Sequence, residues 1–309
     1  MSVLPSEVTF ETIPCPLCKS EHAVEAWRFE DRHGAYAVVR CAGCGFVRLN
    51  PRPTPDTIGV YYQAGDYTPF LSSAGLVSWF GRVYGAVRRY SIRWKRRCIE
   101  RLLGTGSLLD LGCGTGEFLM EMKQNGWTTC GIEPSMEASD FARREYGLDV
   151  TTGGVDAKSL PSWKNRFDWV TMWHVLEHVH DLKPALQLIG EAMTKDGWLL
   201  VAVPNVGSFD ARAYGHDWVA LDPPRHLWHF TPSTMEKLAG QTGFVVQKRH
   251  HMPLDCVFNT IMSEGRAVTR LGKWFWPFGV VRASWRMTAS YFAGLAGNGS
   301  SMMYYLRKR

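Results

Sequence analysis

Three glycines at alternate positions, Gly112, Gly114 and Gly116, follow a short apolar run that contains Asp110. Residues 108–116 read LLDLGCGTG, which predicts a buried parallel strand that turns sharply into a helix. Glycine allows a positive φ and lets backbone amides approach a ligand with no Cβ in the way. Amides at a helix N-terminus favour a negatively charged ligand group. The stretch therefore predicts a ligand-binding turn, and it lacks the lysine and hydroxyl residue of a phosphate-binding P-loop.

A second acidic residue, Glu133, ends the next strand-like segment, TTCGIE, twenty-three residues after Asp110. An acidic side chain at that distance suits hydrogen bonds to the two hydroxyls of a ribose. The alternative is that Glu133 only caps a helix that begins at Ser135. The spacing favours a ribose-binding residue.

Four cysteines form two CxxC pairs, Cys15 with Cys18 and Cys41 with Cys44, and 22 residues separate the pairs. This pattern is typical of a tetrahedral zinc site with four thiolate ligands. Such a site is structural, because no coordination position stays open for a substrate or water. The alternative is four unrelated buried thiols.

Residues 105–250 resemble the class I S-adenosylmethionine-dependent methyltransferases. The resemblance is carried by LDLGCGTG, by GIEPS, by FDWVTMWHVLEHV at residues 167–179 and by KDGWLLVAVPN at residues 195–205. It implies that the glycine turn holds the methionine part of the donor, that Glu133 binds its ribose, and that Asp156 and Ala157 lie beside the adenine. The donor site that it implies comprises Asp110, Gly112, Cys113, Gly114, Gly116, Glu133, Pro134, Asp156, Ala157 and Trp173.

Alternating strand and helix patterns surround these residues. Ser135 is a good N-cap and Gly147 a good C-terminal glycine for one helix, and Thr231 with Pro232 opens another. Later strands are expected at residues 167–172, 198–203, 244–250 and 302–306. The pattern predicts an α/β fold, a doubly wound seven-stranded Rossmann-like methyltransferase sheet with a small N-terminal zinc ribbon.

The expected organisation has three parts. Residues 1–55 form the zinc ribbon and end in an extended NPRPTP connector, and residues 56–104 form a linker with a basic amphipathic helix. Residues 105–309 form the S-adenosylmethionine-binding domain, with an aromatic and basic helical insertion at residues 252–298.

Basic residues concentrate in two segments, although the net charge is only +6. Residues 82–101 carry eight Arg or Lys and one Glu, and residues 265–309 carry eight and no acid. The first segment predicts a helix whose arginine face is either solvated or binds phosphate or lipid. The basic residues of the second segment interrupt the aromatic insertion. Their charges exclude a membrane-spanning helix there, but they permit an interfacial helix or a helical hairpin packed over the acceptor site. We expect a weak, reversible contact with an anionic membrane or a lipid diphosphate.

Methyl transfer from a sulfonium is an in-line displacement, so a general base is needed only if the acceptor carries a proton of high pKa. His226, in LDPPRHLWHF, and His174, after the strand at 167–172, are the expected catalytic residues. The first loop resembles that of zinc-ribbon sugar C-methyltransferases, in which a histidine matching His226 is the base, although Arg225 replaces their acidic residue. The alternative is that His226 and His229 only bond the loop backbone.

Hydrophobic content of 45% and charged content of 21% are typical of a globular protein, and no signal peptide or spanning segment is apparent. Eight cysteines dominated by CxxC pairs fit a reducing cytoplasm. We therefore expect a cytoplasmic methyltransferase, peripheral at most at the inner face of the membrane. Its acceptor would be a small molecule or a saccharide of a polysaccharide pathway. One alternative is an RNA methyltransferase, but the sequence contains no RNA-stacking or NPPY-type motif that would support it. The other is a non-catalytic donor-binding assembly or regulatory protein.

Overall fold

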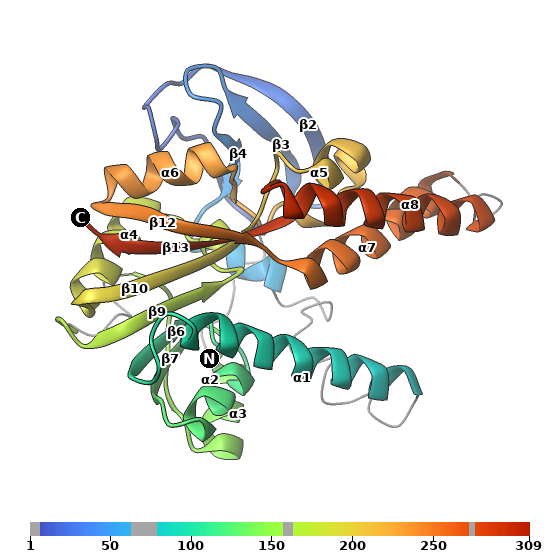
Figure 1. Ribbon diagram of the computed structural model, residues 1–309. Coiled ribbons are helices and arrows are strands. Elements are labelled where there is room, and N and C mark those ends of the chain that lie inside the picture. Colours follow the sequence, from blue (N-terminus) through green and yellow to red (C-terminus); the bar gives the residue numbers. More distant parts are fainter. Residues whose placement is uncertain (1–6, 63–78, 157–162, 272–275) are drawn as a thin grey trace. The chain divides into compact units, whose positions relative to one another are not determined.

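The computed structural model describes residues 7–62, 79–156, 163–271 and 276–309 (Figure 1). Contacts divide the chain into two units, each built from several segments. One, here called the ribbon unit, comprises Met1–Tyr61, Leu176–His180 and Val201–Leu306. The other, the glycine-turn unit, comprises Tyr62–Val175, Asp181–Leu200 and Arg307–Arg309.

Short antiparallel strands form the N-terminal part of the ribbon unit. β2 (Ala23–Asp31), β3 (Gly34–Cys41), β4 (Val47–Leu49) and β11 (Trp228–His229) form one sheet in the order β11-β4-β3-β2. β1 (Phe10–Glu11) pairs with β5 (Arg52–Pro53) in a second, two-stranded sheet. The NPRPTP segment is therefore not only a connector, because two of its residues pair with β1. The strand β11 comes from the loop that contains His226, which the sequence did not predict.

A seven-stranded sheet confirms the expected α/β methyltransferase fold. Its strands are β6 (Ser107–Leu111), β7 (Thr128–Glu133), β8 (Asp149–Thr152), β9 (Phe167–Trp173), β10 (Met193–Pro204), β12 (Phe244–His251) and β13 (Ser301–Lys308). They are ordered β12-β13-β10-β9-β6-β7-β8. The pairs β9-β6, β6-β7 and β7-β8 are parallel, so the carboxyl ends of these four strands meet at one edge. Leu108, Leu109 and Trp169 on these strands are fully buried.

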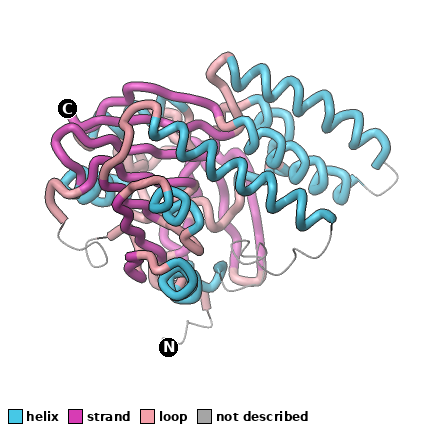
Figure 2. The backbone as a smooth tube through the Cα atoms, turned by 60° about the horizontal axis from the view of Figure 1, so that its bottom comes forward, coloured by secondary structure: helices cyan, strands magenta, loops and turns pink. Residues whose placement is uncertain are grey.

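Eight helices accompany the strands in the described residues, and Figure 2 distinguishes the two kinds of element by colour. They are α1 (Trp79–Glu100), α2 (Glu117–Gln124), α3 (Met136–Tyr146), α4 (Leu182–Ala192), α5 (Phe209–Tyr214), α6 (Pro232–Gln241), α7 (Pro253–Leu271) and α8 (Trp276–Leu295). Single 3-10 turns lie at η1 (Ile58–Tyr62), η2 (Leu176–His178), η3 (Gly215–Asp217) and η4 (Val219–Leu221). None of the helices in the described ranges is long and apolar enough to span a bilayer.

The helix caps expected at Ser135, Gly147 and Thr231 are confirmed. The Ser135 hydroxyl accepts from the Ala138 amide at 3.3 Å, and Gly147 ends α3 with a φ of 56°. Thr231 opens α6 with a capping box. The insertion at residues 252–298 contains α7 and α8, which lie side by side (Figure 1).

Candidate functional site

The glycine turn after β6 uses its three glycines in two different ways. Gly112, Gly114 and Gly116 have φ values of 70°, 57° and 80°, in the left-handed region that favours glycine. A Cβ on Gly112 would lie 2.5 Å from a methyl of Val175, and one on Gly116 would lie 2.6 Å from a methyl of Leu148. A Cβ on Gly114 would meet nothing within 4 Å. The outer glycines therefore permit close packing of the turn, whereas the middle one faces open space.

Glu133 ties the glycine turn to the start of α3. Its Oε2 accepts from the Gly114 amide at 2.8 Å and its Oε1 from the Ser135 amide at 2.9 Å. Burial raises the pKa of this carboxyl group, and the two amides oppose that rise. Glu133 therefore does bond the backbone at the start of the helix, through the Ser135 amide. This bond does not exclude ribose binding, because each carboxylate oxygen has a second lone pair.

Asp110 lies buried on β6 and is held by a neighbouring strand. Thr171 on β9 donates a hydrogen bond to its Oδ1 at 2.6 Å. Burial raises the pKa of Asp110 to about 7, against the opposing effects of Thr171 and of the Lys95 ammonium. Lys95 also lies over the Trp173 ring, 4.4 Å from its centroid. Lys95 was not singled out by sequence reasoning, because nothing in the pattern of α1 distinguishes it from the surrounding arginines.

The remaining expected donor residues differ in exposure. Cys113 is buried, which raises the pKa of its thiol far above the usual range. Pro134 and Asp156 are exposed. Ala157 lies outside the described residues, so its place beside an adenine stays a prediction.

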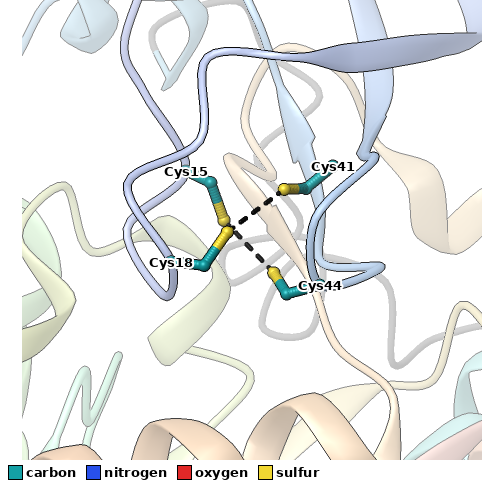
Figure 3. A group of neighbouring side chains, drawn as sticks. All are labelled: Cys15, Cys18, Cys41 and Cys44. Carbon is teal, nitrogen blue, oxygen red and sulfur yellow. Dashed lines mark hydrogen bonds between the residues drawn. The ribbon is translucent and has the colours of Figure 1, made fainter.

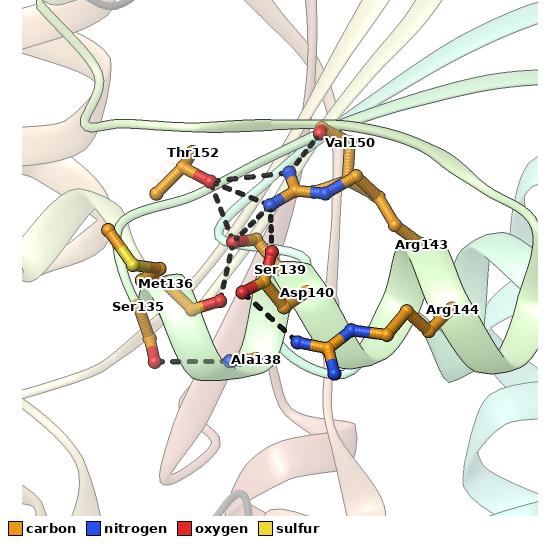
Figure 4. A network of polar contacts seen from close by, with 9 residues as sticks. All are labelled: Ser135, Met136, Ala138, Ser139, Asp140, Arg143, Arg144, Val150 and Thr152. Carbon is orange, nitrogen blue, oxygen red and sulfur yellow. Dashed lines mark hydrogen bonds and ion pairs between the residues drawn. The ribbon is translucent and has the colours of Figure 1, made fainter.

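A polar network fixes α3, the helix that follows Glu133, against β8 (Figure 4). The Arg143 guanidinium donates to the Val150 carbonyl at 2.6 Å and to the Thr152 hydroxyl at 3.2 Å. The Ser139 and Thr152 hydroxyls lie 2.8 Å apart. These bonds hold the helix N-terminus in register with the carboxyl ends of the strands.

Some arginines of the basic helix α1 are used inside the glycine-turn unit. Arg96 pairs with Glu100 at 2.6 Å and with Glu121 of α2 at 2.9 Å, and Arg88 pairs with Glu117 of α2. These ion pairs fasten α1 to the helix that follows the glycine turn. Part of the basic segment that was expected to bind phosphate or lipid is therefore occupied by carboxylates.

The four cysteines of the two CxxC pairs converge in the ribbon unit (Figure 3). The Sγ atoms of Cys15 and Cys44 lie 3.5 Å apart and those of Cys18 and Cys41 lie 3.4 Å apart. These distances exclude disulfides, whose sulfurs are about 2 Å apart. They approach the spacing of about 3.8 Å that four sulfurs take around a tetrahedral zinc ion with Zn–S bonds of about 2.3 Å. The donor set fits zinc.

A second cluster, of histidines and a carboxylate, also lies in the ribbon unit. Ligand atoms of Glu177, His178 and His226 are within 4.8 Å of one another, and the two imidazole centroids are 4.7 Å apart. His178 Nδ1 lies 3.0 Å from the Arg225 carbonyl oxygen, and His226 Nδ1 lies 2.9 Å from the Ala220 carbonyl oxygen. A carbonyl only accepts, so both Nδ1 atoms carry a proton in the neutral imidazoles and both Nε2 atoms have a lone pair.

Electrostatics separate the histidines of this cluster. Burial lowers the pKa of His178 to about 4 and that of His229 to about 3, so both are neutral at physiological pH. Asp222 Oδ2 lies 3.9 Å from His226 Nε2. Burial opposes ionisation of Asp222, but His226 and Arg225 hold its pKa below the usual range. Sequence reasoning missed Asp222, which is four residues before His226, because it considered only the residue immediately preceding the histidine.

The ribbon sheet holds the histidine cluster from one side. Trp228 pairs with Arg48 of β4, and its Nε1 donates to the Val179 carbonyl at 2.5 Å. Arg52 of β5 donates to the His180 carbonyl at 2.9 Å. Both segments that carry the clustered histidines, 176–180 and 225–229, are thus bonded to ribbon residues.

The two expected catalytic histidines belong to different units. His174 follows β9 in the glycine-turn unit and has a φ of 57°, a conformation that non-glycine residues rarely adopt. His226 belongs to the ribbon unit. Among the histidines of the expected acceptor side, the structure brings together His178, His226 and His229.

Comparison with known proteins identifies the family. Residues 85–249, more than half of the chain, match the family model described as a methyltransferase domain. The ubiquinone biosynthesis O-methyltransferase of Azorhizobium caulinodans is 29% identical over 157 residues, which cover 48% of this chain and 62% of that protein. The malonyl-[acyl-carrier protein] O-methyltransferase of Serratia marcescens is 29% identical over 147 residues, covering 45% and 56%.

The matched segment spans less than two thirds of the length of these relatives. Among solved structures, a SAM-dependent methyltransferase from Thermotoga maritima superimposes with a TM-score of 0.49 at 19% identity, covering 74% of this chain and 94% of that one. The family match covers the glycine turn, Glu133 and the loop of His226. The chain belongs to the methyltransferase domain family.

Proposed function

We propose that this enzyme methylates a hydroxyl oxygen of a small-molecule acceptor. The observation that carries the proposal is the open glycine turn at Gly114, which lies within the segment that matches the methyltransferase domain model. The relatives named above are O-methyltransferases, which supports oxygen as the methylated atom. An oxygen acceptor loses a proton of high pKa, and this is the case in which a general base is needed.

The donor residues each have a separate role in this proposal. The bound donor supplies a methyl group on a sulfonium, which needs no activation by the protein. Glu133 and the open side of the turn at Gly114 hold the donor, and Asp110 with Lys95 and Trp173 forms the adjoining polar and aromatic wall. Gly112 and Gly116 let the turn pack closely against Val175 and Leu148, so within the turn only Gly114 leaves room for the donor.

Proton removal is assigned to His226. As the acceptor oxygen bonds to the methyl carbon, the bond from that carbon to sulfur breaks, and the hydroxyl proton passes to His226 Nε2. The Ala220 carbonyl orients the imidazole through Nδ1, and the nearby Asp222 carboxylate stabilises the imidazolium that forms. His178 and His229 are poorer bases, because burial keeps both pKa values far below neutrality. His174 is the next candidate.

Zinc in the ribbon has a structural role in the proposal. Four cysteine sulfurs would fill its coordination shell and hold together the two CxxC turns that flank β2 and β3. β4 pairs with β3 and with β11, so the metal would support the strand that follows His226.

The acceptor itself is tested by comparing metabolites from cells with and without the protein. Mass spectrometry should find one species that gains a methyl group only when the protein is present, and the purified protein should form S-adenosylhomocysteine with the unmethylated species. A saccharide of a polysaccharide pathway stays a prediction within the same chemistry. A product methylated on carbon or nitrogen would contradict the proposal, as would turnover with RNA but no small molecule.

A further inference from the structure

Between residues 257 and 264, helix α7 presents its apolar side chains to solvent and its polar ones to the protein. Thr260 and Ser263 are fully buried, and Glu264 and Asn259 are nearly so. In contrast, Phe258 is 56% and Ile261 is 53% exposed, and Val257 and Met262 are also exposed. A surface helix of a water-soluble domain has the opposite arrangement, with its apolar stripe against the core.

Helix α8 repeats this inversion. Phe278, Val281, Trp285, Phe292 and Leu295 recur at intervals of three, four or seven residues, so they share one helix face. Each of them is at least 60% exposed. Within residues 278–295 of α8, the buried residues are small or polar: Gly279, Ser290 and Gly294. Two adjacent helices with outward apolar faces exceed the scattered exposure that is normal for a monomer.

The inverted orientation is fixed by polar contacts with the rest of the ribbon unit. Ser290 donates to the Asp210 carboxylate of α5 at 2.6 Å. Glu264 accepts from the Tyr214 hydroxyl at 3.0 Å and pairs with Arg282 of α8 at 2.5 Å. Turning either helix over would bury its apolar face but would leave these charged partners without each other, which is costly. The outward apolar face is therefore built into the packing.

Positive charge accompanies the apolar faces. Arg266 and Arg270 lie on the exposed side of α7, one and two turns beyond Met262, and Arg270 pairs with Asp217 at 2.7 Å. A hollow of about 620 Å³ on α8 is lined by three apolar residues and by Arg282 and Arg286, both of which pair with Glu264. This combination of exposed aromatic and aliphatic residues with arginines matches a helix that lies in an anionic membrane interface.

We propose that α7 and α8 dock this methyltransferase on an anionic lipid bilayer, with the exposed apolar faces at the level of the headgroups. The arginines would contact lipid phosphates, and neither helix would cross the bilayer, in keeping with their lack of a spanning segment. A second copy of the chain is a poorer occupant, because a symmetric dimer through this surface would bring the basic sides of α7 and α8 together, and the acids beside them, Asp217 and Glu264, already pair with arginines of the same chain.

Flotation of the full-length protein with vesicles tests the proposal. Wild type should bind phosphatidylcholine vesicles that contain phosphatidylglycerol, and weakly or not at all those of phosphatidylcholine alone. The double variant Trp285→Ser/Phe292→Ser should partition at least about tenfold more weakly, because two aromatic side chains no longer insert. Arg266→Ala should bind about fivefold more weakly at low salt, with the difference shrinking at high salt.

The matched control is Met136→Ser on α3, which removes a side chain that is also highly exposed but lies in the other unit. It should bind vesicles as wild type does. All variants should keep their melting temperature and their affinity for S-adenosylhomocysteine, since the changed side chains are exposed. Equal vesicle binding by the double variant, or no binding of wild type to anionic vesicles, would overturn the proposal. So would a wild-type dimer in sedimentation that the double variant dissociates, because a second copy would then cover this surface.

Discussion

His178 and His226 face each other edge to face, with ring centroids 4.7 Å apart, and each has its Nδ1 bound to a backbone carbonyl. The two residues are 48 positions apart in the chain and meet because the ribbon sheet bonds to both of their segments. Their environments differ in consequence. Burial and the neighbouring imidazole keep His178 neutral, with a pKa of about 4, whereas Asp222 approaches Nε2 of His226. Of the two histidines, His226 is therefore the one placed for proton transfer.

Replacing His226 with Ala should lower the rate of methyl transfer by roughly a hundred- to ten-thousandfold, the contribution of a general base. Affinity for S-adenosylhomocysteine should be unchanged, because the donor residues are in the other unit. His229→Ala is the matched control: His229 is as buried and is neutral, with a pKa of about 3, so its loss should affect stability more than rate. Activity that survives in His226→Ala would make His174 the candidate base.

Purified protein should contain one zinc ion per chain, and Cys18→Ser should lose it. The melting temperature and the rate of methyl transfer should both fall, since β4 carries β11 beside His226. S-adenosylhomocysteine binding should survive, because the glycine turn lies in the other unit. Elemental analysis measures the zinc content, calorimetry measures the melting temperature and the affinity for S-adenosylhomocysteine, and formation of S-adenosylhomocysteine measures the rate.

Cys98→Ser serves as the control for the zinc prediction, because Cys98 is a buried cysteine outside the cluster. Its zinc content should equal that of wild type. Finding no zinc in a reduced, folded preparation would refute a metal role for the four cysteines. A second zinc equivalent that disappears in His226→Ala would instead assign His226 to a metal site with Glu177 and His178.

Asp110→Asn should stabilise the protein at neutral pH and not at acidic pH. The folded-state pKa of Asp110 is about 7, above the usual value of about 3.9 for an aspartate. Such a group contributes stability below pH 4, and that contribution is lost as the pH rises through 7. The free energy of unfolding of the variant, relative to wild type, should therefore rise by roughly 1–4 kcal/mol between these pH values.

Denaturant titrations at both pH values measure this difference. Asp196→Asn is the control, because it is the same substitution at a side chain that is 89% exposed. A constant difference between Asp110→Asn and wild type across the pH range would show that Asp110 titrates as an ordinary exposed aspartate does.

Local signals in the sequence predicted the glycine turn, the acidic end of β7 and the caps of α3, because each depends on residues within one turn or strand. Contacts between distant segments were not predictable in the same way. The pairing of Trp228 with Arg48 joins residues 180 positions apart, and no periodicity in either segment announces it. The aromatic and basic composition of the insertion was evident, but which face of α7 and α8 is buried depends on partners such as Asp210.

Methyl transfer by this chain requires that the middle of the glycine turn face the donor. Gly114 and Gly147 have nearly the same backbone conformation, with φ of 57° and 56°, and a Cβ on either would meet nothing within 4 Å. Alanine at either position should cost a similar amount of stability, on the order of 1 kcal/mol. Calorimetric titration with S-adenosylhomocysteine should then separate them. Gly114→Ala should bind at least about tenfold more weakly, because its methyl occupies the donor's place, a loss of about 1.4 kcal/mol, while Gly147→Ala binds as wild type does. Equal affinity of the two variants would contradict the assignment of the donor site.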